Sequence, residues 1–405
     1  MIHKNKIIAA VCILAFCCGI TTVYYKNHRT YYVPNVIVGA GLSGVTMAER
    51  IATHQKEKVL IIEKRDHVGG NIYDYKDENG ITVQKYGIHA FHTNNDKVWR
   101  YLSQFTNWHN YRHRALAETS KGNVNFPVNL NTIKQLFDKE FAAEFSVKLI
   151  NKYGMGQKIS ISDLQNSEDT VLQQGAQILY EELFKNYTIK QWGMSVDEVD
   201  PSVIARVPVY LNYENAYFTD KYQGIPEYGY TSMIKTMLSN PLIEVRLNTN
   251  WEDVKDKIKY DKLFFSGSID TFFDYKFGKL PYRSLRFDIV QMRQEFFQDC
   301  AQVNHANHPS MTRSIEHKYI LDENSPQSTT VSFEYPEAFD DTNERYYPIN
   351  KPENAELYAK YQQEADKLKN VYFFGRLGDY KYYNMDQAVE RALDLYDKVF
   401  VNQNQ

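Results

Sequence analysis

The stretch NVIVGAGLSG, residues 35–44, decides the fold of this chain. Its first four residues predict a short buried strand, the next six form the pattern G-x-G-x-x-G, and a helical pattern continues to about Thr53. The glycines let the backbone turn tightly and approach a pyrophosphate, whose charge is met by the N–H groups and dipole of the helix N-terminus. We therefore predict a dinucleotide-binding unit rather than an ordinary glycine-rich turn.

The segment that follows indicates which dinucleotide is bound. A second apolar strand, Val59–Ile62, ends in Glu63, 19 residues after Gly44, where an acidic side chain can accept hydrogen bonds from the adenosine ribose. The glycine pair Gly69-Gly70 comes shortly afterwards and is typical of glutathione-reductase-like flavoproteins. This arrangement favours FAD over NAD.

The C-terminal part of the chain is expected to return to the same domain. Residues Val371–Phe374 predict a strand, followed by Gly375–Gly378 and a helix from about Met385 to Phe400, whose apolar residues follow the helical period. In flavoproteins of this class such a strand and helix complete the FAD domain. The domain is therefore expected to be discontinuous in sequence.

The composition of the chain limits its domain number and excludes several classes of function. A chain of 405 residues with 43% hydrophobic content is expected to form two or three domains. Its formal net charge of -3, with no basic run, argues against a nucleic-acid partner. Of its four cysteines only Cys300 lies outside the N-terminal apolar run, so we expect no internal disulfide and a reducing compartment. Without CxxC or HExxH spacing, no metal site is predicted.

The N-terminus carries a possible membrane segment. The run from Ile7 to Tyr25 has no charged residue, and at about 1.5 Å per residue it could cross the roughly 30 Å hydrocarbon core of a bilayer. Basic residues flank both ends, so the charge bias does not fix its orientation. A cleaved signal peptide is the alternative, but no small-x-small cleavage site stands out. We predict a single-pass anchor in residues 1–30, with the catalytic body facing the cytoplasm.

Motifs in the middle of the chain are more specific than the glycine-rich stretch. YGIHAFHT (86–93), NYTIKQWG (186–193) and RVPV (206–209) occur in order, followed by QGIP (223–226), EHKY (316–319), YYP (346–348) and GRLG (375–378). From about Val36 to Phe400 the chain resembles the UDP-galactopyranose mutase family, in its compact bacterial form. It departs from the family pattern at Ile88, Tyr210, Asn384 and His113, where proline, arginine, aspartate and asparagine are usual.

The resemblance implies an α/β fold with three parts around a substrate cleft. They are a discontinuous Rossmann-like FAD domain (32–112, 232–280 and 366–402), a helical domain (113–205) and an antiparallel sheet domain (206–231 and 281–365). The helical period over Asp169–Lys185 predicts that Tyr187 to Trp192 lie just beyond a helix end. Loops held in this way often carry function.

The resemblance also implies an activity and its requirements. UDP-galactopyranose and UDP-galactofuranose would be interconverted through an adduct between the sugar and N5 of reduced FAD, with no net redox change. The chemistry would then belong mostly to the cofactor. The expected partners are UDP-galactose, a flavin reductant (NADPH, NADH or a reductase) and a second copy of the chain in a homodimer.

The resemblance assigns roles to individual residues. The two phosphate charges of UDP-galactose need fixed cations, and a guanidinium fork suits that task. Outside such motifs an arginine is usually a solvated charge, and a histidine or aromatic residue is usually ordinary core. The catalytic residues would be Arg206, Arg313 and His92. The cofactor-binding residues would be Gly39, Gly41, Ser43, Gly44, Glu63, Lys64, Gly70, Asn71, His89, Ala90, Arg376, Asn384, Met385 and Asp386. The substrate-binding residues would be His113, Tyr187, Thr188, Trp192, Tyr217, Phe218, Arg283, Asn304, Tyr347 and Tyr382.

The sequence alone leaves two other functions open. A flavin oxidase or dehydrogenase could share only the FAD domain, but it would need a different cleft in place of the NYTIKQWG and RVPV segments. A non-catalytic, membrane-tethered nucleotide-sugar-binding protein could keep the fold without the activity. Turnover of UDP-galactofuranose would separate all three.

Overall fold

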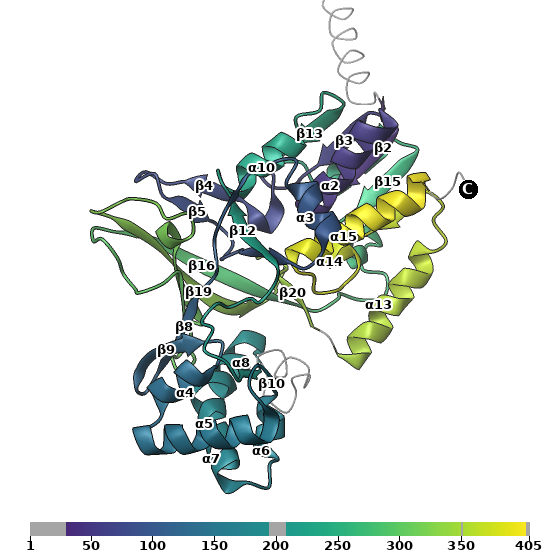
Figure 1. The fold of residues 1–405 in the computed structure, drawn as a ribbon. Helices are drawn as coiled ribbons and strands as arrows, with labels where there is room; N and C mark the ends of the chain where they lie inside the picture. The colour runs from purple at the N-terminus through teal and green to yellow at the C-terminus, as the bar shows by residue number, and fades with distance from the viewer. Residues whose placement is uncertain (1–29, 194–207, 350, 402–405) are drawn as a thin grey trace, which may run out of the picture.

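A five-stranded parallel sheet forms the dinucleotide half of the molecule (Figure 1). The structure is a computed structural model that describes residues 30–193, 208–349 and 351–401. The predicted strands at 35–38 and 59–62 are confirmed, and the strand predicted at 371–374 ends one residue earlier. In spatial order the strands are β13 (Ile243–Arg246), β3 (Val59–Ile62), β2 (Asn35–Val38), β15 (Lys262–Phe265) and β21 (Val371–Phe373).

Helices from both ends of the chain cover this sheet. Helix α15 (Met385–Tyr396) packs against α2 (Leu42–Arg50), as the two neighbouring ribbons in Figure 1 show. Helix α15 turns its apolar face inward and continues into η7 (Asp397–Val401), which confirms the predicted C-terminal helix. All four residues of β3 are buried, as expected for a parallel strand covered on both faces. The Rossmann-like unit is thus completed by a distant segment of the chain.

A seven-stranded sheet, mostly antiparallel, forms the second large layer. The chain segment 113–205, which we assigned to a helical domain, contributes β8 and β9 to this sheet through a parallel pairing of β8 with β17. The exact domain boundaries stay a prediction. In spatial order the strands are β20 (Tyr347–Pro348), β16 (Tyr282–Met292), β19 (Thr329–Ala338), β18 (Arg313–Glu316), β17 (Gln302–Asn304), β8 (Ala115–Thr119) and β9 (Gly122–Phe126).

Shorter elements connect these layers. The small sheets are β6 (Phe91–Thr93), β12 (Tyr222–Pro226) and β7 (Trp108–His109); β4 (Asp74–Lys76) and β5 (Thr82–Gln84); β1 (Tyr31–Tyr32) and β14 (Ile258–Lys259); and β10 (Lys158–Ile159) and β11 (Val209–Tyr210). The connecting helices are η1 (Ile51–Gln55), η2 (Gly70–Ile72), α3 (Asp96–Leu102), α10 (Tyr230–Met237), α11 (Trp251–Val254), η5 (Lys255–Lys257), α12 (Ile269–Phe272), η6 (His317–Tyr319), α13 (Pro352–Ala365) and α14 (Gly375–Gly378).

A group of helices lies beyond the seven-stranded sheet, at the lower end of Figure 1. It has its own apolar core, which includes residues of β8 and β9. Gly175 allows close packing there, because a Cβ at this position would lie 2.5 Å from the ring of Phe145. The helices are α4 (Leu130–Leu136), α5 (Lys139–Tyr153), α6 (Ile161–Gln165), α7 (Thr170–Leu179), η3 (Tyr180–Lys185) and α8 (Asn186–Trp192).

The prediction that Tyr187 to Trp192 follow a helix end is wrong. These residues form α8, which continues from α7 through the π-helical turn η3. The helix ends instead at Gly193, whose φ of +65° is the left-handed conformation that glycine adopts readily. The apolar pattern predicted the first part of the helix but not its polar continuation, which is fixed by contacts with the sheet.

No membrane-spanning helix occurs in the described part of the chain. Within residues 30–193, 208–349 and 351–401, no helix combines the length and apolar character needed to cross a bilayer. The predicted anchor segment, residues 7–25, lies outside these ranges. It therefore stays a prediction.

Candidate functional site

The loop between β2 and α2 is shaped by its glycines. Gly39 has a φ of +101°, and a Cβ there would lie 2.3 Å from Oγ of Ser266. A Cβ on Gly44 would lie only 2.0 Å from the carbonyl oxygen of Gly39, so only glycine allows α2 to start this close to the turn. The loop therefore leaves main-chain N–H groups at the N-terminus of α2 open to an anionic group.

Glu63 ends β3 and braces this loop. Its carboxylate accepts hydrogen bonds from the backbone N–H groups of Ala40, at 2.7 Å, and Arg65, at 2.9 Å. A carboxylate has about four acceptor positions, so Glu63 can still accept from ribose hydroxyls. The acid that was predicted from its spacing thus also holds the glycine-rich loop in place.

A cavity of about 620 Å³ lies along this loop and continues to the N-terminus of α15. We call the loop at 39–44, Glu63 and residues 375–385 the dinucleotide cradle. Of the predicted cofactor residues, Ala90 and Asp386 are absent from the lining; the Asp386 carboxylate accepts from the Thr93 hydroxyl at 2.8 Å. The predicted residues that line the cavity are Gly39, Gly41, Ser43, Gly44, Glu63, Lys64, Gly70, Asn71, His89, Arg376, Asn384 and Met385.

His89 lies where the cradle meets the seven-stranded sheet. Burial lowers its pKa to about 4, and the positive charges of Arg376 and Arg313 act in the same direction. His89 is therefore neutral at physiological pH, and its Nδ1 lies 2.9 Å from the carbonyl oxygen of Gly87. Because a carbonyl only accepts, Nδ1 carries the proton and Nε2 is left as an acceptor.

Arg313, whose positive charge acts on His89, is the central charge of a second group of residues. Its Nε donates to the hydroxyl of Tyr187 at 2.8 Å and lies 3.4 Å from Oε1 of the buried Glu334. Burial alone would lower the pKa of Arg313, but the Glu334 carboxylate together with Tyr187, Tyr347 and Tyr217 raises it above its ordinary value. Burial raises the pKa values of Tyr217 and Tyr347, and the positive charge of Arg313 acts to lower both. We call these five residues the Arg313 cluster.

Helix α8 is held on the sheet by two further cations. Nζ of Lys190 donates to the carbonyl oxygens of His305, His308 and Met311, in the turn that leads to Arg313. Arg283 donates from Nε to the carbonyl oxygen of Gln191 at 3.0 Å and from Nη2 to that of Lys190 at 3.4 Å. Arg283, predicted to bind substrate, thus caps the C-terminus of α8 in this structure.

His92 and Phe218 stack face to face. Their ring centroids are 3.7 Å apart with an interplanar angle of 12°, and Nδ1 of His92 lies 3.0 Å from Oδ2 of Asp220. Tyr217 meets Phe218 edge-on, at 4.9 Å between centroids. The sequence motif predicted His92, but the carboxylate that orients its ring comes from a segment 128 residues away.

A buried polar chain leads from His113 to Asn304. Nε2 of His113 lies 3.3 Å from Oε1 of Gln302, whose Nε2 donates to Oδ1 of Asn304 at 2.8 Å. Nδ1 of His113 lies 2.9 Å from the hydroxyl of Tyr111. Burial lowers the pKa of His113 to about 4, so the ring is neutral. Asn304 in turn pairs with Arg313 across β17 and β18.

Tyr347 and Tyr382 connect the Arg313 cluster to the cradle. Their ring centroids are 5.8 Å apart, and the guanidinium of Arg376 lies 4.9 Å from the Tyr382 ring and 6.0 Å from the Tyr347 ring. Arg376 also donates to the carbonyl oxygens of Tyr346 and Tyr383. The two groups of predicted residues are thus adjacent.

Three predicted site residues remain: Thr188 and Trp192, which lie on α8, and Arg206. Thr188 is buried and Trp192 half-buried on α8. Arg206 lies outside the described residues. Sequence reasoning missed Glu334, which lies in no quoted motif, and gave no role to Lys190, although it stands inside NYTIKQWG. A buried carboxylate that faces an arginine on the neighbouring strand leaves no pattern in a single sequence.

Comparisons with known proteins agree with this arrangement. The UDP-galactopyranose mutase family profile matches residues 182–382, and an NAD(P)-binding Rossmann-like domain profile matches residues 37–105. A crystal structure of reduced UDP-galactopyranose mutase has a TM-score of 0.67 at 15% sequence identity and covers 92% of this chain and 95% of that one. This likeness and the Rossmann-like profile show the fold: an α/β fold with a Rossmann-like domain, as predicted.

Two relatives are similar over most of their length. A UDP-galactopyranose mutase from Mycoplasma genitalium is 38% identical over 377 residues, covering 87% of this chain and 91% of its own. A dTDP-fucopyranose mutase from Escherichia coli is 36% identical over 366 residues, covering 89% of this chain and 96% of its own. With the profile match, the cradle and the predicted motifs, they show that the chain belongs to the UDP-galactopyranose mutase family of flavin-dependent isomerases.

Proposed function

We propose that this protein interconverts UDP-galactopyranose and UDP-galactofuranose, with FAD as the cofactor and without net oxidation or reduction. The observation that carries the proposal is the half-buried Arg313, which is fixed by Tyr187 and Glu334 and belongs to a cluster whose Tyr347 ring lies 6.0 Å from the guanidinium of Arg376 in the dinucleotide cradle. A charged diphosphate held at Arg313 would bring its sugar to the end of the cradle. Family membership supports the same activity.

FAD fits the cradle. The glycine-rich loop exposes N–H groups for its pyrophosphate, Glu63 can accept from its ribose, and the cavity runs on to Arg376, Asn384 and Met385 for its ring system. When bound and reduced, the flavin supplies a nitrogen nucleophile for the anomeric carbon of the sugar. The neutral His89 offers an acceptor at Nε2 near this end.

The side chains of the protein would hold the nucleotide and exclude water. Arg313, with Arg206, would neutralise the diphosphate and keep UDP in place after the anomeric bond breaks. Because Tyr187 and Glu334 fix Arg313 beforehand, little reorganisation is needed when the phosphate charge develops. Stacking and polar contacts with the uridine and sugar would come from Thr188, Trp192, Tyr217, Phe218, Asn304, Tyr347 and Tyr382.

A second candidate substrate follows from the comparison with the Escherichia coli relative. That protein is a dTDP-fucopyranose mutase and is nearly as similar to this chain as the UDP-galactopyranose mutase is. The two substrates differ in the base, the ribose 2′-hydroxyl and the sugar. UDP-galactose is our first choice because the matching family profile is described as UDP-galactopyranose mutase and the relative at 38% identity carries the same name.

Parallel turnover assays test this proposal. Purified protein in reducing buffer would receive UDP-galactofuranose or dTDP-fucofuranose, and the products would be separated by chromatography. We expect UDP-galactopyranose from the first and slower turnover of the second. Faster turnover of the dTDP sugar would assign the second substrate, and no pyranose from either would leave a binding protein or a flavin oxidase.

Membrane attachment, assembly and reductant belong to the same proposal. We infer a single-pass anchor from the uncharged run between Ile7 and Tyr25, with the catalytic body on the cytoplasmic side. A homodimer and a pyridine-nucleotide or protein reductant are expected from the family resemblance. Fractionation of the full-length protein would place it in the membrane pellet if the anchor is retained.

A further inference from the structure

The loop between β19 and β20, residues 339–346, reaches the adenosine side of the cradle. Two of its residues, Glu344 and Arg345, line the cavity next to Lys64 and Arg65, which follow the ribose-binding acid Glu63. The loop belongs to the seven-stranded sheet, whereas Lys64 and Arg65 follow a strand of the parallel sheet. Contacts across this gap join the two layers over the cavity.

Glu344 makes these contacts with both basic residues. Its Oε2 lies 3.1 Å from Nζ of Lys64 and 2.9 Å from Nη2 of Arg65, and its Oε1 accepts from Nε of Arg65 at 3.3 Å. Burial would raise the pKa of Glu344, but Arg65 and Lys64 outweigh burial and lower it to about 2. The carboxylate is therefore charged at neutral pH. We call this three-residue group the Glu344 clasp.

Arg65 is fixed on three sides and has one unused donor. Besides Glu344, its Nη2 donates to Oδ1 of Asn71 at 3.0 Å, and its guanidinium lies 4.5 Å from the centre of the Tyr86 ring. Nη1 is buried and has no hydrogen-bond partner among the residues that the structure describes. A buried guanidinium N–H without an acceptor is costly, so an acceptor on a bound molecule is expected there.

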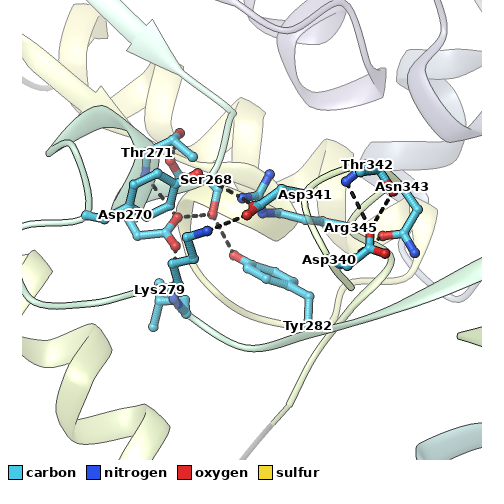
Figure 2. Close-up of polar contacts among 12 residues, drawn as sticks. Ser268, Asp270, Thr271, Lys279, Tyr282, Asp340, Asp341, Thr342, Asn343 and Arg345 are labelled. Carbon is cyan, nitrogen blue, oxygen red and sulfur yellow. Dashed lines mark hydrogen bonds and ion pairs between the residues drawn. The ribbon is translucent and has the colours of Figure 1, made fainter. Parts of the chain in front are cut away.

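The loop that carries Glu344 is itself held in a defined shape, as Figure 2 shows. The Asp340 carboxylate accepts from the backbone N–H of Thr342 at 3.0 Å, and Asp341 forms an ion pair with Lys279. The guanidinium of Arg345 lies 4.1 Å from the centre of the Phe339 ring. Glu344 is therefore presented to Arg65 from a braced loop rather than from a free one.

We propose that Arg65 is a further cofactor-binding residue, whose Nη1 donates to an oxygen on the adenosine side of FAD. Glu344 is then a positioning residue: its ion pairs with Arg65 and Lys64 hold the loop 339–346 against the adenosine side of the cavity. This inference rests on the proposed FAD cofactor. Its consequence is slower release of the flavin. It involves none of the residues that would touch the sugar.

The test measures how fast purified flavoprotein releases FAD, from the rise in flavin fluorescence after dilution. Glu344→Gln keeps the shape of the side chain and removes its charge; Arg65→Met removes the donor. Glu337→Gln is the matched control, because Glu337 pairs with Arg286 at 3.1 Å on the same sheet but does not line the cavity. We expect release to become about three- to tenfold faster in the first two variants and to stay unchanged in the control.

The salt dependence of the FAD release rate distinguishes loss of the Glu344 clasp from a general loss of folding. Added salt should speed FAD release from the wild-type protein by screening the clasp, and Glu344→Gln should lose most of this dependence. Lys64→Met changes a half-exposed side chain, so it should fold normally and show a smaller effect in the same direction. Wild-type release rates and salt dependence in both Glu344→Gln and Lys64→Met would overturn the proposal.

This test separates the clasp from the proposed function. A flavoprotein that fails to convert the sugar still reports on FAD release, so the clasp can hold while the mutase assignment fails. A protein that takes up no FAD at all removes the clasp proposal together with its cofactor.

Discussion

The dinucleotide cradle presents mainly main-chain groups to its ligand, whereas the Arg313 cluster consists of side chains. In the cradle, glycines admit backbone where no Cβ fits, and Glu63 braces the loop through N–H groups. In the Arg313 cluster, a guanidinium is fixed by a phenol and a carboxylate from two other elements. From this difference we expect that substitutions which distort the backbone of the cradle abolish cofactor binding. Substitutions of side chains in the Arg313 cluster should instead abolish turnover and leave the cofactor bound.

The largest effect is expected at Gly44. In Gly44→Ala the new Cβ would meet the Gly39 carbonyl at 2.0 Å, and backbone cannot move aside cheaply. We expect a loss of at least about 1–3 kcal/mol of stability and no retained flavin. Gly41→Ala is the matched variant, because its Cβ has no atom closer than 3.9 Å. It should keep the melting temperature of the apoprotein but bind flavin weakly. Wild-type flavin content in Gly44→Ala would contradict the comparison.

Arg313→Ala should have the opposite signature. It removes a charge-assisted contact of roughly 1.5–3 kcal/mol, which corresponds to about tenfold to a hundredfold or more in turnover, with flavin content unchanged. Arg206→Ala, outside the described residues, should behave in the same way. Steady-state kinetics and flavin absorbance on one preparation provide the measurement. Normal kinetics would remove the arginine from the site.

The buried Glu334 makes stability a second measurement on the Arg313 variant. Arg313→Ala leaves this carboxylate without its ion-pair partner, so the variant should also lose stability. The double variant Arg313→Ala, Glu334→Gln should regain stability but not turnover. Equal melting temperatures for the single and double variants would show that Glu334 does not depend on Arg313.

A smaller effect is expected from His113, through pH. Its pKa of about 4 in the folded protein lies below the usual 6.5, so the unfolded chain binds the proton more tightly. Stability is therefore lost as pH falls from about 6.5 toward 4, by about 2 kcal/mol between pH 7 and 5 for one such group. His113→Asn should be less sensitive to acid over that range. Parallel pH profiles of unfolding for variant and wild type would be evidence against a neutral His113.

The smallest effect is expected from removing residues 1–30. The cradle begins after this segment, so the truncated protein should bind FAD and turn over substrate as the full chain does. Flavin content and specific activity of both forms are the measurement. A folded, truncated protein without flavin would show that the N-terminal segment contributes to the site.

The same contrast explains what the sequence could predict. Strands β2 and β3, the glycine-rich loop and Glu63 follow from local spacing, because residues 35–63 carry the whole pattern in one short piece of chain. Helix α8 was mistaken for a loop because the contacts that hold it reach distant parts of the chain: Lys190 bonds to the turn at 305–311, and Arg283, 92 residues from Gln191, caps the helix end. Glu334 could not be found, since no local pattern marks a carboxylate whose purpose is to hold an arginine on the neighbouring strand.

Resemblance to a family supplied residue identities but not their contacts. Arg283 was expected to bind substrate, and its guanidinium caps α8. Ala90 and Asp386 were expected at the cofactor, and neither lines the cavity. Motifs identify the side chains of a site, whereas their packing decides which atoms remain free for a ligand.

The central claim is a redox-neutral isomerisation at a flavin that must be reduced, and anaerobic turnover of UDP-galactofuranose tests it most directly. The protein would be assayed fully oxidised and after titration with dithionite, counting reductant consumed per UDP-galactopyranose formed. We predict no turnover by the oxidised protein and many turnovers per equivalent of reductant after reduction. Equal rates for the oxidised protein, or one equivalent consumed per product, would contradict the account.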